Sequence, residues 1–119
     1  IAVVVALARN NQPYLGSRTV VAVIQVNDEG TVDNIASKLQ QASQVYIGSN
    51  HYFASQLSAD VTTNASTGKK QAIIKISGLG DISNNKSIFL GQRIYANQEV
   101  QIHSNYFAKG YVTDFYYEN

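Results

Sequence analysis

Val45-Tyr-Ile-Gly-Ser-Asn-His-Tyr-Phe-Ala54 is the stretch that decides the fold, because the chain repeats it as Val100-Gln-Ile-His-Ser-Asn-Tyr-Phe-Ala108. The first copy has one extra residue, His51, and the similarity continues to the pairs Asp60-Val61 and Asp114-Phe115. Nine aligned positions are identical or apolar in both copies. Agreement at this level is not expected by chance in 119 residues, so we infer an internal repeat.

Each copy of the repeat, over 45–61 and 100–115, predicts a strand, a polar corner and a second strand. Val-x-Ile gives the alternation of a half-buried strand. Ser-Asn favours a turn, because short polar side chains bond their own backbone. Two such hairpins predict a mainly β domain, either a pseudo-symmetric β-barrel or a β-sandwich.

The remaining chain adds one amphipathic helix, predicted at about 31–42. Its apolar stripe has helical spacing and consists of Val32, Ile35, Ala36 and Leu39. Thr31 is expected to cap the helix. Strands are predicted at Arg18–Val26, Gln44–Ile47, Tyr52–Val61, Gln71–Ser77, Ser87–Leu90, Glu99–His103 and Phe107–Tyr117. Polar loops are expected at 62–68 and 78–85.

Composition narrows the classes of function. Charged residues make up 14% of the chain and the net charge is +1, so no basic field attracts nucleic acid or anionic lipid. Asn (11), Gln (10), Ser (11) and Thr (6) supply the polarity instead. Cysteine is absent, which excludes disulfides and thiolate chemistry. Methionine is absent even at position 1, which suggests a processed mature chain.

The first ten residues form a separate apolar segment ahead of a single β-rich domain at 11–119. The run Ile1–Ala8 is too short to span a bilayer and ends at Arg9. Three interpretations stay open: a core strand, the stub of a membrane helix, or a strand donated to a neighbouring subunit. The donor-strand interpretation assigns assembly to Ile1, Val3, Val4, Val5 and Leu7.

Catalytic, cofactor and metal sites are not predicted. The eight carboxylates form no recognisable acid–base pair, and His51 and His103 lack metal-ligand spacing. No nucleophile elbow, dinucleotide loop or calcium loop is present, and no small-molecule substrate is identified. An enzyme needs a nucleophile or base beside an orienting group, and the sequence shows none.

Two sets of residues are candidates for surface roles. Four tyrosines near the C-terminus are candidate interface aromatics, and they are Tyr106, Tyr111, Tyr116 and Tyr117. Two Asn-x-Ser sequons place candidate glycosylation at Asn64 and Asn85. The repeat itself has two interpretations. Its paired aromatics and Asp60 and Asp114 either form a binding site at a pseudo-dyad or are corner and core residues, and we favour the second interpretation.

The stretch Leu90–Ile102, followed by Ala108–Asp114, resembles the end of single-pass prokaryotic surface proteins that carry an N-terminal membrane helix and a duplicated β-domain. The resemblance covers about the last 75 residues. It implies that Ile1–Ala8 is the tail of a membrane helix, with an anchor upstream of residue 1. These proteins have no assigned activity to carry over.

We therefore expect a non-enzymatic, extracellular structural protein at the cell surface. The main hypothesis is a pilus-like filament subunit, a homo-polymer assembled by donating the N-terminal strand to a neighbour. The alternative is a membrane-anchored monomeric ectodomain that binds a small ligand or a partner protein. Neither hypothesis involves nucleic acid or a cofactor.

Overall fold

The fold is built from eight strands and one helix in the part of the chain that the computed structural model describes, residues 16–48, 52–83 and 86–118. The elements follow in the order β1 (Arg18–Val26), α2 (Glu29–Leu39), β2 (Gln44–Ile47), β3 (Phe53–Thr63), β4 (Lys70–Asp81), β5 (Ile88–Phe89), β6 (Gln92–Arg93), β7 (Glu99–His103) and β8 (Phe107–Tyr117). Strands make up 57% of the described residues and helix 11%, so this part of the chain is mainly β, as predicted.

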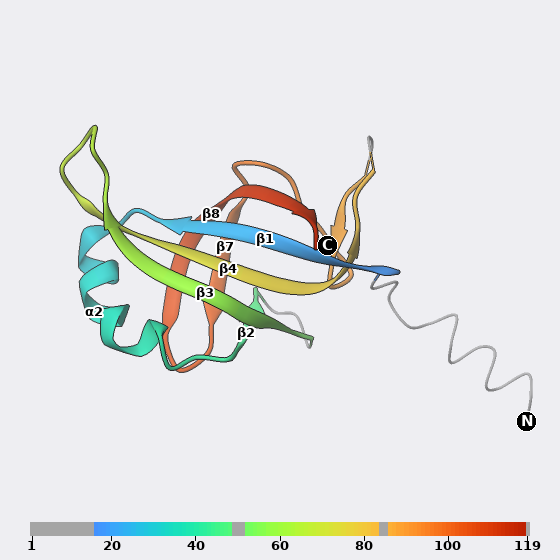
Figure 1. Ribbon diagram of the computed structural model, residues 1–119, viewed down its shortest axis with the longest axis horizontal. Coiled ribbons are helices and arrows are strands. Elements are labelled where there is room, and N and C mark those ends of the chain that lie inside the picture. Colours follow the sequence, from blue (N-terminus) through green and yellow to red (C-terminus); the bar gives the residue numbers. More distant parts are fainter. Residues whose placement is uncertain (1–15, 49–51, 84–85, 119) are drawn as a thin grey trace, which may run out of the picture.

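The strands form one antiparallel sheet that returns to its first strand. The order is β1-β8-β7-β2-β3-β4-β5-β6, and β1 also pairs with β4. Six strands therefore form a closed cycle, and β5 and β6 branch off from β4 as a small hairpin (Figure 1). Every strand of the cycle therefore has a neighbour on both sides over part of its length, which leaves fewer exposed edges than an open sheet. This single antiparallel sheet is compatible with the predicted β-barrel or β-sandwich.

A pseudo-two-fold axis relates the two halves of the chain. β2 pairs with β7, and Ile47 lies opposite Ile102, its own counterpart in the repeat. Across the cycle, β1 pairs with β4, and Ile24 lies opposite Ile74. The same rotation relates β3 to β8. Both hairpins of the repeat therefore form as predicted, and they share the central β2–β7 pair.

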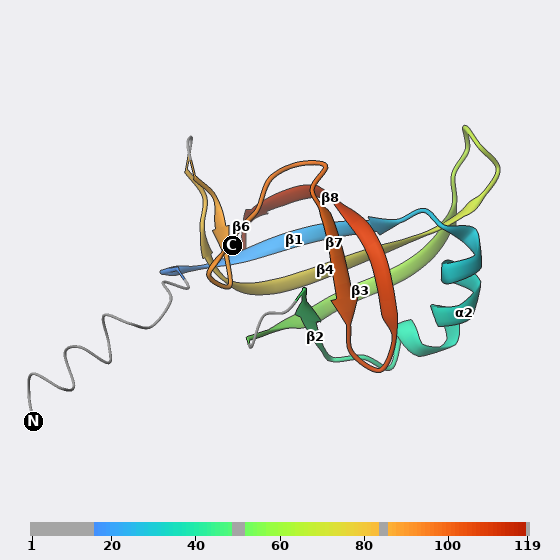
Figure 2. The same cartoon turned by 180° about the vertical axis from the view of Figure 1, so that it is seen from behind.

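The repeat is longer than the sequence similarity first indicated. The rotation places Ala22-Val-Ile-Gln-Val26 of β1 on Ala72-Ile-Ile-Lys-Ile76 of β4, two stretches with alike side chains at every position. Each half thus contributes three strands to the cycle, β1-β2-β3 and β4-β7-β8. α2 is inserted after the first strand of one half, and β5–β6 at the equivalent place in the other. Figure 2 shows these two insertions at opposite ends of the sheet.

β3 and β8 each change partner along their length, and a β-bulge marks the change. β3 passes from β2 to β4 with a register shift between Gln56 and Ser58. β8 passes from β7 to β1 with a shift opposite Val23 and Ile24. An extra residue bends a strand and increases its twist, which lets these strands turn the corners of the cycle.

Side chains from the inner face of the cycle form the core, and α2 covers one end of it. β1 buries Val20, Ala22, Ile24 and Val26 completely, and the other strands contribute their alternate residues. The apolar stripe of α2, which is Val32, Ile35 and Leu39, packs into the same cluster. A three-turn helix gains most of its stability from such packing.

The helix begins earlier than predicted, and Thr31 is not its cap. α2 starts at Glu29, and the N-cap is Asp28, whose carboxylate accepts hydrogen bonds from the Thr31 backbone amide at 3.3 Å and the Thr31 hydroxyl at 2.6 Å. A carboxylate at this position also interacts favourably with the helix dipole. Asp28 therefore caps the helix, and Thr31 lies within the first turn. The helix ends at Leu39, three residues before the predicted end.

The predicted loop at 78–85 is wrong in its first part, because β4 continues to Asp81. Gly78 and Gly80 belong to the strand, and the second lies so close to β5 that an added Cβ would stand 2.3 Å from the Ile88 carbonyl oxygen. Glycine in a strand often marks close approach of a second backbone. The short strand Gln92–Arg93, which the sequence did not predict, completes the hairpin here.

Several predictions concern residues outside the described ranges. They include the N-terminal segment with Ile1, Val3, Val4, Val5 and Leu7, the histidine at position 51, and the sequon residue Asn85. Within the described ranges, the structure contains no helix with the length and hydrophobicity needed to cross a membrane.

Candidate functional site

Four ring-bearing side chains lie directly opposite one another across four neighbouring strands. Phe53 of β3 faces Tyr46 of β2, Tyr46 faces His103 of β7, and His103 faces Phe107 of β8. We call Phe53, Tyr46, His103 and Phe107 the aromatic row. Its two end residues, Phe53 and Phe107, are matched residues of the repeat, and the row crosses from β2 to β7 one residue pair away from the Ile47–Ile102 pair.

Strand alternation places the aromatic row on the outer face of the sheet. Every member is followed or preceded by a side chain that is buried in the core, and these neighbours are Val45, Ile47, Ala54, Ile102 and Ala108. Successive side chains on a strand point to opposite faces. The same residues that fill the core therefore hold the four rings outward in a fixed register.

Ring contacts order the row at its centre. Tyr46 stacks on His103, with centroids 5.6 Å apart and ring planes 23° apart. Phe53 meets Tyr46 edge-on, at 6.2 Å and 73°. His103 Nε2 lies 2.7 Å from the carbonyl oxygen of Gly48, and because a carbonyl can only accept, Nε2 carries the proton and donates. The imidazole is therefore held in one orientation beside Tyr46.

The ends of the row are open to solvent. Phe53 is 47% exposed and Phe107 is 59% exposed, whereas Tyr46 and His103 are half-buried. A single exposed apolar residue is ordinary, but exposed rings aligned with two further rings form a contact surface. Tyrosine and phenylalanine are enriched at such surfaces because each offers a large area with few rotatable bonds.

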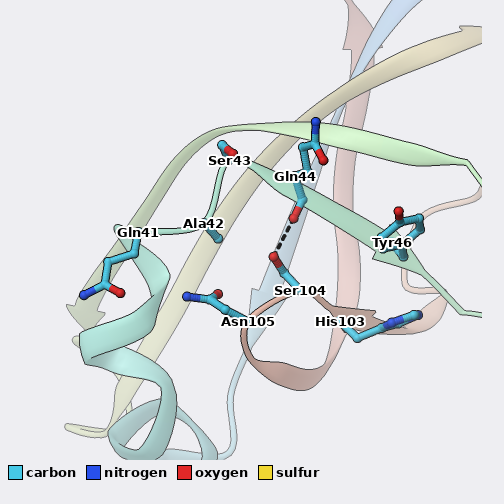
Figure 3. A pocket seen from close by; sticks show the side chains of 8 residues that line it. All are labelled: Gln41, Ala42, Ser43, Gln44, Tyr46, His103, Ser104 and Asn105. Carbon is cyan, nitrogen blue, oxygen red and sulfur yellow. Dashed lines mark hydrogen bonds between the residues drawn. The ribbon is translucent and has the colours of Figure 1, made fainter.

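A polar groove of about 410 Å³ adjoins the centre of the row (Figure 3). It lies between the segment that follows α2 and the turn that joins β7 to β8. Its lining consists of Gln41, Ala42, Ser43, Gln44, Tyr46, His103, Ser104 and Asn105. None of these side chains carries a fixed charge, so the groove presents amides, hydroxyls and two rings.

Hydrogen bonds hold the two walls of the groove together. The Ser104 hydroxyl donates to the carbonyl oxygen of Gln44, as Figure 3 shows. The Asn105 side-chain amide donates to the carbonyl oxygen of Lys38, near the end of α2, at 3.4 Å. The side-chain amides of Gln41 and Gln44 are exposed and have no hydrogen bond to the described part of the chain. These two amides are therefore available to a ligand.

A second layer of polar contacts fixes the groove to the core. The Tyr106 hydroxyl donates to Gln56 Oε1 at 2.8 Å, and Gln56 Nε2 donates to the carbonyl oxygen of Leu39 at 2.5 Å. The backbone amide of Ser104 donates to the carbonyl oxygen of Tyr106 at 2.8 Å. Burial raises the pKa of Tyr106 to about 12, because the phenolate would lose its hydration.

The groove contains a serine beside a histidine, but the two are not arranged as a nucleophile and a base. The Ser104 hydroxyl and His103 Nε2 are each bonded to a backbone carbonyl instead. A nucleophile–base pair requires a hydrogen bond between the two side chains and a group that orients the base. Within the described ranges, no group of three His, Asp or Glu side chains is placed to hold a metal ion.

The four candidate interface tyrosines do not form one surface. Tyr106 is 5% exposed and belongs to the core, and Tyr117 bonds the backbone of Ile82 while the Arg18 guanidinium lies 3.6 Å from its ring centroid. Tyr111 and Tyr116 are exposed, but they lie five positions apart on β8. The structure therefore leaves these two available for contacts.

The remaining candidates are separate from the aromatic row. Asp60 and Asp114 lie on β3 and β8, and the strands β4 and β1 run between them on that side of the cycle. Asn64 occupies a turn in which its side-chain oxygen accepts from the Ser66 amide at 2.9 Å and its amide donates to Gln71 at 3.3 Å. Phe53 and Phe107, the matched phenylalanines of the repeat, thus lie at the two ends of the aromatic row with Tyr46 and His103 between them, and Tyr106 is buried. The predicted site of paired aromatics and aspartates does not form as one cluster.

Tyr46, Gln41 and Gln44 were not singled out from the sequence. A signal for Tyr46 existed, because it lies between the core residues Val45 and Ile47 and must therefore face outward. The pairing of β2 with β7, which brings Tyr46 to His103, could not be read from either hairpin alone.

Comparison of the chain with protein-family models, curated protein sequences and solved structures gave no significant match in any of the three.

Proposed function

We propose that the protein is a non-enzymatic recognition domain that works at the cell surface, and that the aromatic row with its polar groove is the binding face. This is the alternative of the two hypotheses drawn from the sequence. The observation that supports it best is the row itself, four outward rings in one register line with both end rings exposed. Covering one exposed phenylalanine contributes about 1.5–3 kcal/mol, which favours contact with a partner.

The rigidity of this face supports the same proposal. The backbone under the row belongs to the closed cycle, and the groove walls are bonded to the end of α2 and to Gln56. Binding residues held by regular elements lose little conformational entropy when a ligand binds. The uncharged lining of the groove and the low charge of the chain agree with recognition by shape and neutral polar groups.

Isolated bacterial cell walls, freed of nucleic acid, provide a direct test in a sedimentation assay. The full chain should sediment with the walls, and the double variant F53T/F107T should stay in the supernatant. Threonine keeps strand propensity, so the fold should be retained, which circular dichroism checks. Y95T is the matched control, because Tyr95 is 57% exposed and outside the row. Equal sedimentation of all three chains, or of none, contradicts the proposal.

A second candidate is the filament subunit, which an apolar hollow on the outer face favours. This hollow of about 410 Å³ is lined in part by Tyr52, Phe53, Leu79 and Leu90, and Leu79 is 45% exposed. The apolar run Ile1–Ala8 of a neighbouring chain has the side chains to fill it. The cycle already closes within the described residues, through the pairing of β1 with β4. A donated segment would therefore not complete the cycle. It would cover this outer face or pair beside β6.

Removal of residues 1–8 tests the filament candidate. The truncated chain should fold as a monomer and form no polymer by electron microscopy, while the full chain polymerises. L79T in the full chain should also block assembly, because it removes an exposed part of the acceptor surface. Polymers formed by the truncated chain would exclude strand donation.

A further inference from the structure

We propose that the aromatic row and its groove bind a neutral polysaccharide chain, an inference that rests on the recognition function proposed above. The observation that carries it is the combination of aligned outward rings with an uncharged rim of free amides. The rings can pack against the C–H faces of a sugar, and the amides can form hydrogen bonds with its hydroxyls.

The rings provide the apolar part of the contact. One face of a pyranose presents C–H groups, which pack on an aromatic ring through dispersion, water release and weak C–H contacts to the π-system. Phe53 and Phe107 are exposed for such packing, and Tyr46 and His103 continue the line between them. A chain of sugar rings that runs across the four strands would meet them in succession.

The rim provides the polar part. Sugar hydroxyls both donate and accept hydrogen bonds, and an amide side chain offers both a donor and an acceptor. Gln41 and Gln44 are exposed, and their side-chain amides have no hydrogen bond within the described residues. A ligand hydroxyl can therefore bond them without breaking a contact in the protein.

The charge distribution selects a neutral ligand. No Asp, Glu, Lys or Arg belongs to the row or to the lining of the groove within the described residues. On the same outer face, Lys109 and Glu99 lie 3.6 Å apart and neutralise each other. Phosphate-rich or sulfated chains need several cationic contacts for affinity. The row and the groove lining supply none, so an uncharged glycan fits them better than a nucleic acid or an acidic polysaccharide.

The length of the row indicates a chain instead of a single sugar. Three inter-strand spacings of about 4.8 Å separate the end strands, which gives a row of about 14 Å. A monosaccharide would cover one or two rings, whereas a short oligosaccharide would cover all four. Affinity should therefore rise with the number of sugar units and then become constant once the row is covered.

A proline-rich peptide is the competing ligand, because extended peptides of this kind also dock on aromatic surfaces. Such a peptide presents backbone carbonyls as acceptors and few donors. The free amide oxygens of Gln41 and Gln44 would then have no donor to accept from. Because each of these amides both donates and accepts hydrogen bonds, the saccharide, whose hydroxyls do the same, is the better match.

Affinity electrophoresis tests the inference with the full chain. Native gels contain, separately, hydroxyethyl cellulose, mannan, xylan, dextran, the anionic polysaccharide alginate, and poly-L-proline. At least one neutral polysaccharide should retard the wild-type chain, and alginate should not do so better. F53T and Y46T should each lower the association constant about tenfold, and Y95T should leave it unchanged. Oligosaccharides of increasing length, used as competitors, measure the dependence on chain length.

The outcomes separate this inference from the recognition function. Retardation by poly-L-proline alone, or by alginate better than by the neutral chains, overturns the saccharide. Absence of retardation in every gel also overturns the saccharide inference. If sedimentation with cell walls still depends on the row, the recognition function stands without it. Row variants that match the wild-type chain both in gels and with cell walls overturn both.

Discussion

Ile47 and Ile102 lie opposite each other across β2 and β7, and each holds the same place in its copy of the repeat. Ile47 is 8% exposed and Ile102 is fully buried, so the pseudo-two-fold axis passes through the core. Ile24 and Ile74 form the corresponding pair on the other side of the cycle. Packing of Ile47 and Ile102 in the core fixes the register of β2 against β7. The same register fixes the aromatic row, which lies beside this pair on the outer face of the sheet.

Truncation of the buried pair should strongly destabilise the protein. I24A and I74A should each lower the free energy of unfolding by about 2–5 kcal/mol, the usual range for a buried isoleucine reduced to alanine. Urea unfolding followed by circular dichroism measures this. The control L79A alters an exposed residue and should change stability by less than about 0.5 kcal/mol. Since Ile24 and Ile74 are neighbours, the double variant should deviate from additivity. A small effect of I24A would contradict the described core.

Removal of the helix cap should show which residue starts α2. D28A should lower the free energy of unfolding by about 1 kcal/mol, because the Asp28 carboxylate accepts from the Thr31 amide at the N-terminus of the helix. D33N breaks only an exposed pair with Lys70 and should cost close to nothing. Thermal unfolding of both variants gives the comparison. If D33N were the more harmful change, the assigned cap would be wrong.

The buried Tyr106 should make stability depend on alkaline pH. Its pKa is raised from 10.0 to about 12 in the folded protein, so the unfolded chain loses this proton first as the pH rises. The contribution is fully present below about pH 10 and is lost as the pH approaches 12. Y106F has no hydroxyl to titrate and should show a smaller decrease over that window. Urea midpoints at pH 9 and 11 measure the difference, and parallel curves for both chains would refute the assignment.

Two glycines should respond in opposite ways to alanine. G80A places a Cβ 2.3 Å from the Ile88 carbonyl oxygen, where backbone has to shift, and should destabilise by about 1–3 kcal/mol or more. G30A lies in α2, with no atom within 4 Å of the new Cβ, and should stabilise by about 0.4–1 kcal/mol. Melting temperatures of the two variants decide the point. If G80A left the melting temperature unchanged, β5 would not pack against β4 as closely as described.

Much of the fold was predictable because its signals are local. β1, β2, β7 and β8 match their predicted bounds, since alternating or continuous apolar residues identify a strand without knowledge of its partners. The errors occur where contacts between residues far apart in the sequence determine the local structure. Gly78 and Gly80 have the composition of a turn, yet they continue β4 because β5 packs closely on them.

The candidate site was only partly predictable for the same reason. Each hairpin places one aromatic pair across its corner, Tyr46 with Phe53 and His103 with Phe107, and both pairs follow from strand alternation. The contact between the hairpins joins the pairs into one row, and no local pattern encodes that register. Tyr106 was grouped with surface tyrosines because sequence shows a phenol but not its bond to Gln56.

The closed cycle of strands also bears on how such a chain can originate. Within the first half, β1 has no partner, since it pairs only with β4 and β8 of the second half. One half alone would therefore leave open edges, and two identical halves would be needed to satisfy them. A gene encoding a single half would give a homodimer with this architecture, and the turn at 64–69 that now joins β3 to β4 would be the product of fusing two such genes. Such a fusion would leave each half free to acquire its own insertion, a helix in one and a hairpin in the other.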